Sequence, residues 1–364
     1  MKKAKVFTMG ILAAAVVLSL AGCSGKKSAT TDTGSKDSGK TTTKTVALIT
    51  DTGGVDDRSF NQSAWEGLEA WGKTHDFTRG NKGFQYFQSK SESDYVANIN
   101  SAKAAGFKTI FGIGYKLQPA IEQSAKKNPK LNFVIIDDSI KGLDNVVSAT
   151  FKDNESSYLA GIAAAYTTKT NIVGFVGGAK GDVIDRFDAG YAEGVAAGAK
   201  ELGKSVKVIN QYAGDFSAPD KGKSIAQGMY QQGADIIFHA SGATGNGVFQ
   251  EAKAINQAGS KKVWVIGVDR DQSDEGKYTT KDGDSANFTL TSTLKGVNKV
   301  TEDLSEKAFK GEFKGGQHII YGLKDDGVGL AKGQLSAKTQ KAVDQAKQDI
   351  IDGKITVSEH PAKK

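Results

Sequence analysis

The sequence predicts an α/β protein with two doubly wound lobes, each a parallel sheet covered by helices, joined by hinge strands. After residue 44, short runs of β-branched and aromatic residues alternate with segments of helical period. This strand–helix–strand spacing requires parallel pairing with right-handed crossovers. The chain of 364 residues is long enough for two lobes, and its 44 glycines beside only 4 prolines are typical of many tight turns.

The N-terminus has the pattern of a bacterial export signal. Lys2, Lys3 and Lys5 are positive, Val6–Leu20 is apolar, and the segment ends at Cys23, the only cysteine of the chain. The letters LAGC resemble the lipobox of bacterial lipoproteins, which implies cleavage before the cysteine and a lipid on its thiol. An uncleaved anchor helix is the alternative, but the apolar run is short for a bilayer span. We therefore expect a signal peptide over residues 1–22 and a lipid anchor on the extracytoplasmic face of the cell membrane.

Residues 23–44 contain almost nothing apolar and predict a flexible tether. The formal net charge is +7, and removing the three signal lysines leaves +4 (7 − 3). The arginines are few and scattered, whereas nucleic-acid sites depend on arginine clusters with interleaved aromatic residues. We therefore expect no nucleic-acid partner.

The apolar runs predict two series of strands. They lie at Val46–Ile49, Phe84–Phe87, Thr109–Ile113, Phe133–Ile136 and Val146–Ala149, and then at Ile172–Val176, Val206–Ile209, Asp235–Phe238, Val263–Gly267 and Asn287–Leu290. The helical segments between them lie at Gln62–His75, Ser93–Ala105, Gln118–Lys127, Ser156–Thr168, Phe187–Leu202, Asp220–Gln232, Gly247–Ala258 and Lys295–Lys310. Ser59 or Asn61 is expected to cap the first helix.

The break between the two series near Thr150 predicts the change of lobe. The segments after residue 290 are too few for a third lobe, so we expect them to cross back and complete the other two. The first lobe is predicted to comprise residues 45–149 and 292–314, and the second residues 150–291 and 315–364. A cleft between lobes joined by several strands can close around a ligand.

Polar and aromatic residues follow several predicted strands, where open parallel sheets bind ligands. In the stretch Val46–Leu68, Asp51, Phe60 and Asn61 are expected at this edge. The equally plausible alternative is that Asp51 only ends a strand, Phe60 packs in the core and Asn61 caps a helix. The later candidates are Asp137, Phe216, Gly242, Asp269 and Lys295. Each alone has a structural explanation, and their joint placement at one rim is what predicts a binding cleft.

Enzyme signatures are weak. Gly222-Lys223-Ser224 lacks the earlier glycine of a phosphate loop, and the glycine-rich segment Ser241–Gly247 lacks dinucleotide spacing. Asp271–Asp282 only faintly resembles a calcium loop, the four histidines show no ligand spacing, and no nucleophile motif is present. We expect no enzyme activity, no metal and no cofactor.

Several motifs resemble the basic membrane protein family, the PnrA-like lipoproteins that act as purine nucleoside receptors of ABC importers. They are TDTGGVDDRSFNQSAWEGL, the VIIDD after Phe133, GDFSAPDKGK, HASGATGNGVFQEA, IGVDRDQ and LTSTLKGV, and together they cover the chain from Val46 onward. The resemblance implies a type I periplasmic-binding-protein fold and a nucleoside such as adenosine, guanosine or inosine in the cleft. It also implies an ABC permease and ATPase as partners, and we expect a monomer.

The resemblance also implies roles for the candidates. The base is expected between Phe60 and Phe216, with Asp137 and Asn61 at its edge. Asp269 would accept ribose hydroxyls, Gly242 would offer a backbone contact, Lys295 a further donor, and Asp51 matches a cleft aspartate of the family. Two rivals remain, a binding protein for a sugar, autoinducer or peptide-like solute and a nucleoside hydrolase.

Overall fold

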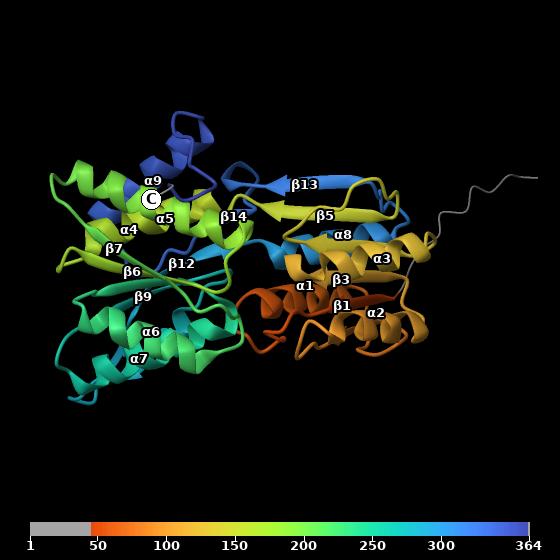
Figure 1. Ribbon diagram of the computed structural model, residues 1–364, viewed down its shortest axis with the longest axis horizontal. Coiled ribbons are helices and arrows are strands. Elements are labelled where there is room, and N and C mark those ends of the chain that lie inside the picture. The colour runs from red at the N-terminus through yellow and green to blue at the C-terminus, as the bar shows by residue number, and fades with distance from the viewer. Residues whose placement is uncertain (1–44, 363–364) are drawn as a thin grey trace, which may run out of the picture. The chain divides into compact units, whose positions relative to one another are not determined.

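The computed structural model describes residues 45–362 (Figure 1). The predicted signal peptide, the lipidation site Cys23 and the tether lie outside the described residues. Within the described part of the chain, no helix is both long enough and apolar enough to cross a membrane.

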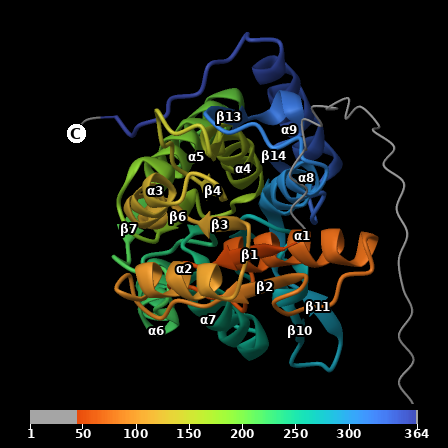
Figure 2. The ribbon, with the colours of Figure 1, turned by 90° about the vertical axis from the view of Figure 1, so that its right-hand side faces the viewer.

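The first sheet has six parallel strands in the order β13-β5-β4-β3-β1-β2. Their bounds are β1 Val46–Ile49, β2 Phe84–Phe87, β3 Thr109–Ile113, β4 Asn132–Ile136, β5 Val146–Phe151 and β13 Gln317–Tyr321. One face is covered by α1 (Phe60–Thr74) and α8 (Val297–Phe309), and the other by α2 (Asp94–Ala104) and α3 (Gln118–Lys127). Figure 2 shows the strands β1 to β4 between these two pairs of helices. We call this sheet and its helices the first lobe.

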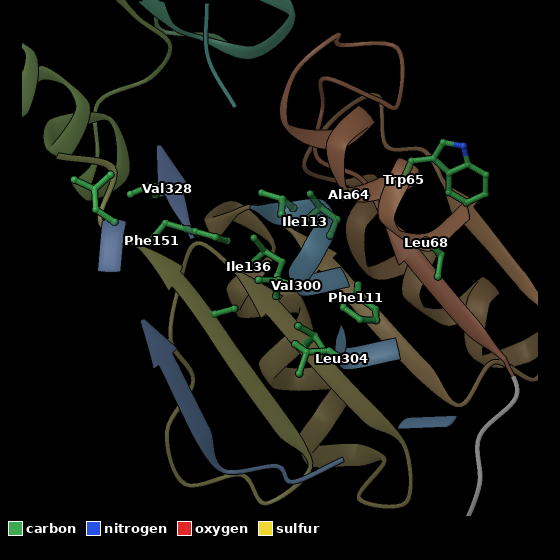
Figure 3. Packing of buried hydrophobic residues seen from close by; sticks show 14 of the residues in the cluster. Ala64, Trp65, Leu68, Phe111, Ile113, Ile136, Phe151, Val300, Leu304 and Val328 are labelled. Carbon is green, nitrogen blue, oxygen red and sulfur yellow. The ribbon is translucent and has the colours of Figure 1, made fainter. Parts of the chain in front are cut away.

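Side-chain alternation along the strands explains why both faces are covered. In β1, Val46 and Leu48 pack in the cluster with α1 and α8, whereas Ala47 and Ile49 pack in the cluster with α2 and α3. All four side chains are fully buried, as expected for a parallel strand with helices on both sides. Figure 3 shows the first of these clusters, in which side chains of α1 and α8 meet those of the strands.

The second sheet has the order β14-β12-β9-β8-β6-β7 and is parallel except for the antiparallel pair β12–β14. Its strands are β6 Ile172–Gly177, β7 Lys207–Tyr212, β8 Ile236–Ala240, β9 Trp264–Gly267, β12 Thr289–Lys295 and β14 Val328–Leu330. Helices α4 (Asp153–Thr167) and α5 (Asp182–Glu201) cover one face, and α6 (Pro219–Gln231) and α7 (Gly245–Ala258) the other. We call this sheet and its helices the second lobe.

Smaller elements complete the described chain. Helix α9 (Ala337–Ile351) packs on α4, and β10 (Lys277–Thr279) pairs with β11 (Ser285–Asn287) as an antiparallel hairpin. The 3-10 turns are η1 Tyr115–Leu117, η2 Gly242–Thr244, η3 Ser273–Gly276 and η4 Leu323–Asp325. Strands β10, β13 and β14 and helix α9 were not predicted from the sequence, and the predicted strand Asn287–Leu290 overlaps β11 only at Asn287.

The two sheets are wound in the same way. In each, the first strand lies between the second and the third, so the strand order reverses at β1/β3 and at β6/β8. Ligands of doubly wound sheets bind beyond the carboxyl ends of the strands at such reversals. The α/β class and the two doubly wound lobes predicted from the sequence are thus confirmed.

The chain passes between the sheets three times, from β5 to α4, from β12 to α8, and from β13 to β14. The assignment of residues 315–364 to the second lobe is wrong for β13, because this strand pairs with β5 along the edge of the first sheet. The predicted return to the first lobe at residue 292 is also too early, because β12 of the second sheet continues to Lys295. The remaining boundaries stay a prediction.

Candidate functional site

A cavity of about 580 Å³ lies where the strands of both sheets end. This volume includes the open mouth of the cavity. All eight candidates from the sequence line it, namely Asp51, Phe60, Asn61, Asp137, Phe216, Gly242, Asp269 and Lys295. The structure therefore brings together side chains that are up to 244 residues apart (295 − 51).

The loop between β1 and α1 is organised by Asp57. Its carboxylate accepts the backbone N–H groups of Ser59, Asn61 and Gln62 at 2.8 to 3.1 Å, and the side-chain amide of Asn61 at 2.9 Å. Ser59 occupies the N-cap position of α1, as predicted, but its side chain makes no cap bond, because Asp57 supplies the side-chain acceptor. The Ser59 hydroxyl donates instead to Asp269 of the second lobe.

Asn61 also holds Asp51. The Asn61 amide nitrogen donates to Asp51 Oδ1 at 2.7 Å, and the Asn61 amide oxygen accepts the Asp51 backbone N–H at 3.1 Å. Both amide hydrogens of Asn61 are therefore used, one on Asp51 and one on Asp57, and only its oxygen keeps acceptor capacity toward the cavity.

Replacing Asp57 by alanine is expected to lower the free energy of unfolding by about 1–3 kcal/mol. Three backbone N–H groups at the start of α1 would lose their common acceptor. Urea unfolding followed by circular dichroism measures this. Asp94, the first residue of α2, likewise accepts backbone N–H groups, those of Lys90 and Ser91 in the preceding loop, at an exposed site, so Asp94→Ala is the control and should cost less. Equal losses in the two variants would contradict the central role given to Asp57.

A buried ion network joins the lobes, and two of its members, Asp137 and Lys295, line the cavity. Lys295, at the end of β12, places its Nζ 2.7 Å from Asp137 Oδ2 and 3.2 Å from Asp153 Oδ1. Asp153 begins α4, and its other oxygen lies 3.4 Å from Arg186. Asp153 and Lys295 thus stand at two of the three places where the chain crosses between lobes.

The charges of this network depend on one another. Burial alone lowers the pKa of Lys295, but attraction from Asp137, Asp153 and Asp269 outweighs it and raises the pKa, so Lys295 is charged. Burial raises the pKa of Asp153 despite Lys295 and Arg186. The ammonium group also lies over the rings of three phenylalanines, at 5.1 Å from Phe151, 5.2 Å from Phe60 and 5.7 Å from Phe187.

One carboxylate oxygen of Asp137 is unpaired. Its Oδ2 binds Lys295, whereas its Oδ1 is buried and has no hydrogen-bond partner among the described residues. An unpaired buried acceptor is costly. The backbone of Asp137 also has a φ of +71°, and that of Asp269 a φ of +67°, which non-glycine residues seldom adopt. Such strain is typical of residues held for a function.

Asp269 and Asp51 are deeply buried acids. Burial raises the pKa of Asp269 to about 7, opposed by Lys295 and by the hydrogen bond from Ser59, and supported by Asp57 and Asp137. Burial raises the pKa of Asp51 to about 6, opposed by its bonds from Gly53 and Asn61. Near neutral pH these two groups are therefore partly protonated, and each can donate as well as accept a hydrogen bond.

The raised pKa of Asp269 predicts a pH-dependent effect of Asp269→Asn on stability. In the wild type, the folded protein holds this proton up to about pH 7 and the unfolded chain releases it near pH 4. The contribution of Asp269 to stability therefore falls as pH rises from 4 to 7. The asparagine variant lacks this loss, so its stability relative to the wild type should increase over that window in urea unfolding.

Asp94→Asn is the control, because the contribution of Asp94 to stability depends on pH in the opposite direction. Hydrogen bonds from Lys90 and Ser91 lower the pKa of Asp94, so its contribution to stability is lost as pH falls below 4. If the difference in free energy of unfolding between Asp269→Asn and the wild type stayed constant from pH 4 to 7, this would contradict the assigned burial of Asp269.

Two phenylalanines come from opposite lobes. Phe60 is the first residue of α1, and Phe216 follows β7 with its ring against the backbone of Gly178, where any Cβ would lie 2.2 Å from the ring. The ring of Tyr115 meets Phe216 edge to face at 6.4 Å. Gly242 has a φ of +55° and turns the chain next to Phe216. The cavity thus combines aromatic surface with buried carboxylates.

Several residues that line the cavity were not predicted from the sequence. Tyr115 and Lys116 follow β3 after one intervening residue, so the rule about carboxyl ends would have found them. Val183, Ile184 and Phe187 of α5 form an apolar wall, but their helical spacing cannot be told from a core pattern. Among residues 45–362 no group of three or more His, Cys, Asp or Glu side chains is arranged to hold a metal ion.

Comparison with known proteins confirms the predicted type I solute-binding fold. A family model described as ABC transporter substrate-binding protein, PnrA-like, matches residues 44–360. The "ABC transporter nucleoside-binding protein BmpA" of Lactococcus lactis is 51% identical over 98% of this chain and 99% of its own. The "CD4+ T-cell-stimulating antigen" of Listeria monocytogenes is 54% identical over 87% of this chain and 88% of its own. The crystal structure of an ABC transporter solute-binding protein from Aeropyrum pernix superposes with a TM-score of 0.76 at 25% identity, over 88% of this chain and 94% of that one.

Proposed function

Because this chain belongs to the PnrA-like family of ABC transporter substrate-binding proteins, we propose that it captures purine nucleosides between its lobes and delivers them to a membrane permease driven by a cytosolic ATPase. Adenosine, guanosine and inosine are the candidate ligands. The name of the Lactococcus lactis relative, a nucleoside-binding protein, supports this choice.

The observation that carries the proposal is the unpaired Oδ1 of Asp137 at a cavity lined by Phe60 and Phe216. A purine offers flat faces for two rings and N–H groups at its edge for a carboxylate. Stacking of a base on an aromatic side chain contributes about 1–3 kcal/mol, and a hydrogen bond to a charged group about 1.5–3 kcal/mol. The oxygen of Asn61 is a second acceptor for the base edge.

The remaining candidates suit the ribose. Asp269 and Asp51 accept sugar hydroxyls, and in protonated form can donate to sugar oxygens. Lys295 provides a further donor, and Gly242 a backbone contact where a side chain would obstruct the sugar. Asp51, Asp57, Asp137 and Asp269 stand in the lining beside only Lys116 and Lys295 as cations. A phosphate would be repelled by these carboxylates, so the site favours a nucleoside over a nucleotide.

Ligand that touches both lobes stabilises the closed form, and we expect this form to engage the permease. The protein acts outside the cytoplasm, and Cys23 is proposed to carry the lipid that holds it at the membrane. We propose that it works as a monomer and as a carrier without enzyme activity.

Isothermal titration calorimetry tests the proposal directly, using protein stripped of bound ligand by unfolding and refolding. Adenosine, guanosine and inosine should each release or absorb heat with one site per chain, and inosine monophosphate should bind much more weakly. Mass spectrometry of small molecules that co-purify with the protein identifies the natural ligand. Absence of binding to all three nucleosides would refute the proposal, and a co-purified sugar would point to the rival class of solute. Free hypoxanthine after incubation with inosine would indicate a hydrolase.

A further inference from the structure

Beside the cavity, the loop that precedes α1 is fastened to the opposite lobe. Four contacts cross between the lobes here: Arg58 to Glu275, Glu66 to Arg270, Ser59 to Asp269, and Gln272 to the backbone of Arg58. The two ion pairs involve partly or largely exposed side chains, with Arg58 at 56% exposure and Glu66 at 40%. Exposed ion pairs contribute little and weaken further in salt.

Gln272 is different because it is 1% exposed and uncharged. Its side-chain nitrogen donates to the carbonyl of Arg58 at 2.9 Å, and its side-chain oxygen accepts the backbone N–H of Val268 at 2.9 Å. Its own backbone N–H donates to Ser292 Oγ at 3.0 Å. A backbone donor at one end and a backbone acceptor at the other fix which way the amide points.

His239 contacts the same side-chain amide of Gln272. Its Nε2 lies 3.0 Å from the Gln272 oxygen, and since that oxygen can only accept, the Nε2 carries the hydrogen. Burial lowers the pKa of His239 to about 4, so the ring is neutral over the physiological range. A Cβ at Gly245 would lie 2.0 Å from the ring, which leaves the imidazole no room to turn. His239 and Gln272 are outside the lining of the cavity, although Ala240 and Ser241 belong to it.

The backbone of Arg58, whose carbonyl accepts the bond from Gln272, has an unusual conformation. Arg58 has a φ of +60°, a conformation that non-glycine residues seldom adopt. The next two residues after it are Ser59 and Phe60, and Phe60 faces the cavity. A bond that fixes the Arg58 carbonyl therefore also fixes the start of α1, from which the aromatic ring and Asn61 reach the ligand.

We propose that Gln272 is a positioning residue that latches the two lobes in the closed form, by binding the Arg58 carbonyl while His239 holds its amide in the correct orientation. As far as it concerns retention of a nucleoside, the latch rests on the proposed function. It acts on closure itself, so it can also be tested without any ligand. It slows ligand release and leaves ligand capture almost unchanged, because the bond forms only after the lobes meet.

The test measures lobe distance and ligand release in the same variants. The full chain carrying Cys23→Ser receives spin labels through Lys127→Cys on α3 and Lys253→Cys on α7, two exposed positions on opposite lobes. Pulsed electron paramagnetic resonance gives the distribution of distances without ligand. Stopped-flow fluorescence gives the association and dissociation rates of inosine.

Gln272→Leu should reduce the closed population and speed inosine dissociation about tenfold, with less than a twofold change in association. The effect should persist in 1 M salt, whereas that of Glu275→Gln should fade there. Gln334→Leu is the matched control, because Gln334 donates the same kind of bond to Thr289 at 2.7 Å within the second lobe. It should leave both readouts unchanged.

Gln272→Glu separates a latch from a general defect in folding. The carboxylate keeps the oxygen that faces Val268 and His239, but it turns a second oxygen toward the Arg58 carbonyl. Closure should be weakened where this acid is ionised and recover as pH falls and the acid regains a hydrogen to donate. Unchanged distances and release rates in Gln272→Leu would overturn the proposal, as would a Gln272→Glu defect that acid does not reverse. Loss of the closed population in a protein that binds no nucleoside would support the latch and refute only the proposed ligand.

Discussion

Replacement of Lys295 by methionine is expected to lower the free energy of unfolding by about 3–5 kcal/mol, the usual result of removing one partner of a buried ion pair. The Lys295 side chain is 3% exposed, and its ammonium group is paired with Asp137 and Asp153, whose side chains are 5% and 0% exposed. Methionine fills a similar volume but leaves these carboxylates without their main counter-charge. Urea unfolding monitored by circular dichroism measures the loss.

The control for this experiment is Lys310→Met directly after α8, where the lysine is 55% exposed and pairs with Glu306 on the surface. Its effect should stay within about 1 kcal/mol. The double variant Lys295→Met with Asp153→Asn should recover part of the lost stability, because a neutral amide replaces one of the abandoned charges. If Lys295→Met were no more destabilising than Lys310→Met, the network could not be a buried junction between the lobes.

The second large effect concerns the ligand. Phe60→Ala and Phe216→Ala are each expected to weaken nucleoside binding by about 1–3 kcal/mol, because each removes one stacking face. The double variant should lose about 2–6 kcal/mol, which at the upper end abolishes measurable binding. Calorimetry with inosine measures the affinities, and circular dichroism verifies that each variant is folded.

Phe313→Ala provides the comparison, since Phe313 is a partly buried phenylalanine that packs against the first core and lies outside the cavity lining. Its affinity for inosine should equal that of the wild type. If Phe60→Ala bound inosine as tightly as the wild type, the base could not lie on this ring, and a solute other than a nucleoside would become the better candidate.

The sequence predicted the central strands well because parallel strands buried on both faces appear as short continuous apolar runs. β1, β2 and β3 have the predicted bounds, and β4 differs by one residue. The edge and late elements lack this pattern. β13 has mostly exposed or half-buried residues, and its partner β5 ends 166 residues earlier (317 − 151), so nothing local indicates which sheet it joins.

Eight residues of the site were predicted from the sequence, but the contacts that hold them were not. The rule that ligands bind at the carboxyl ends of strands, together with the resemblance to the PnrA-like family, predicted eight residues that the fold brings to one cavity. The contacts that hold these residues are not local and were not predicted. Asp153, Arg186 and Gln272 act on residues far away in the sequence, and no short motif marks an acid, a base or an amide as their partner. The capping role of Asp57 was within reach, because an aspartate just before a helix is a common acceptor.

The connection of the last segments to the first sheet has a consequence for how the chain is made. Strand β13 and helix α8 belong to the first lobe, although residues 152 to 296 separate them from the rest of it. A ribosome that has released only the first 150 residues has therefore produced a sheet with one edge and part of one face uncovered. Long-range contacts of this kind form slowly. We expect the nascent first lobe to stay loosely packed and accessible to chaperones until residue 321 has emerged. A chain truncated before α8 should therefore contain no stably folded first lobe and should not bind ligand.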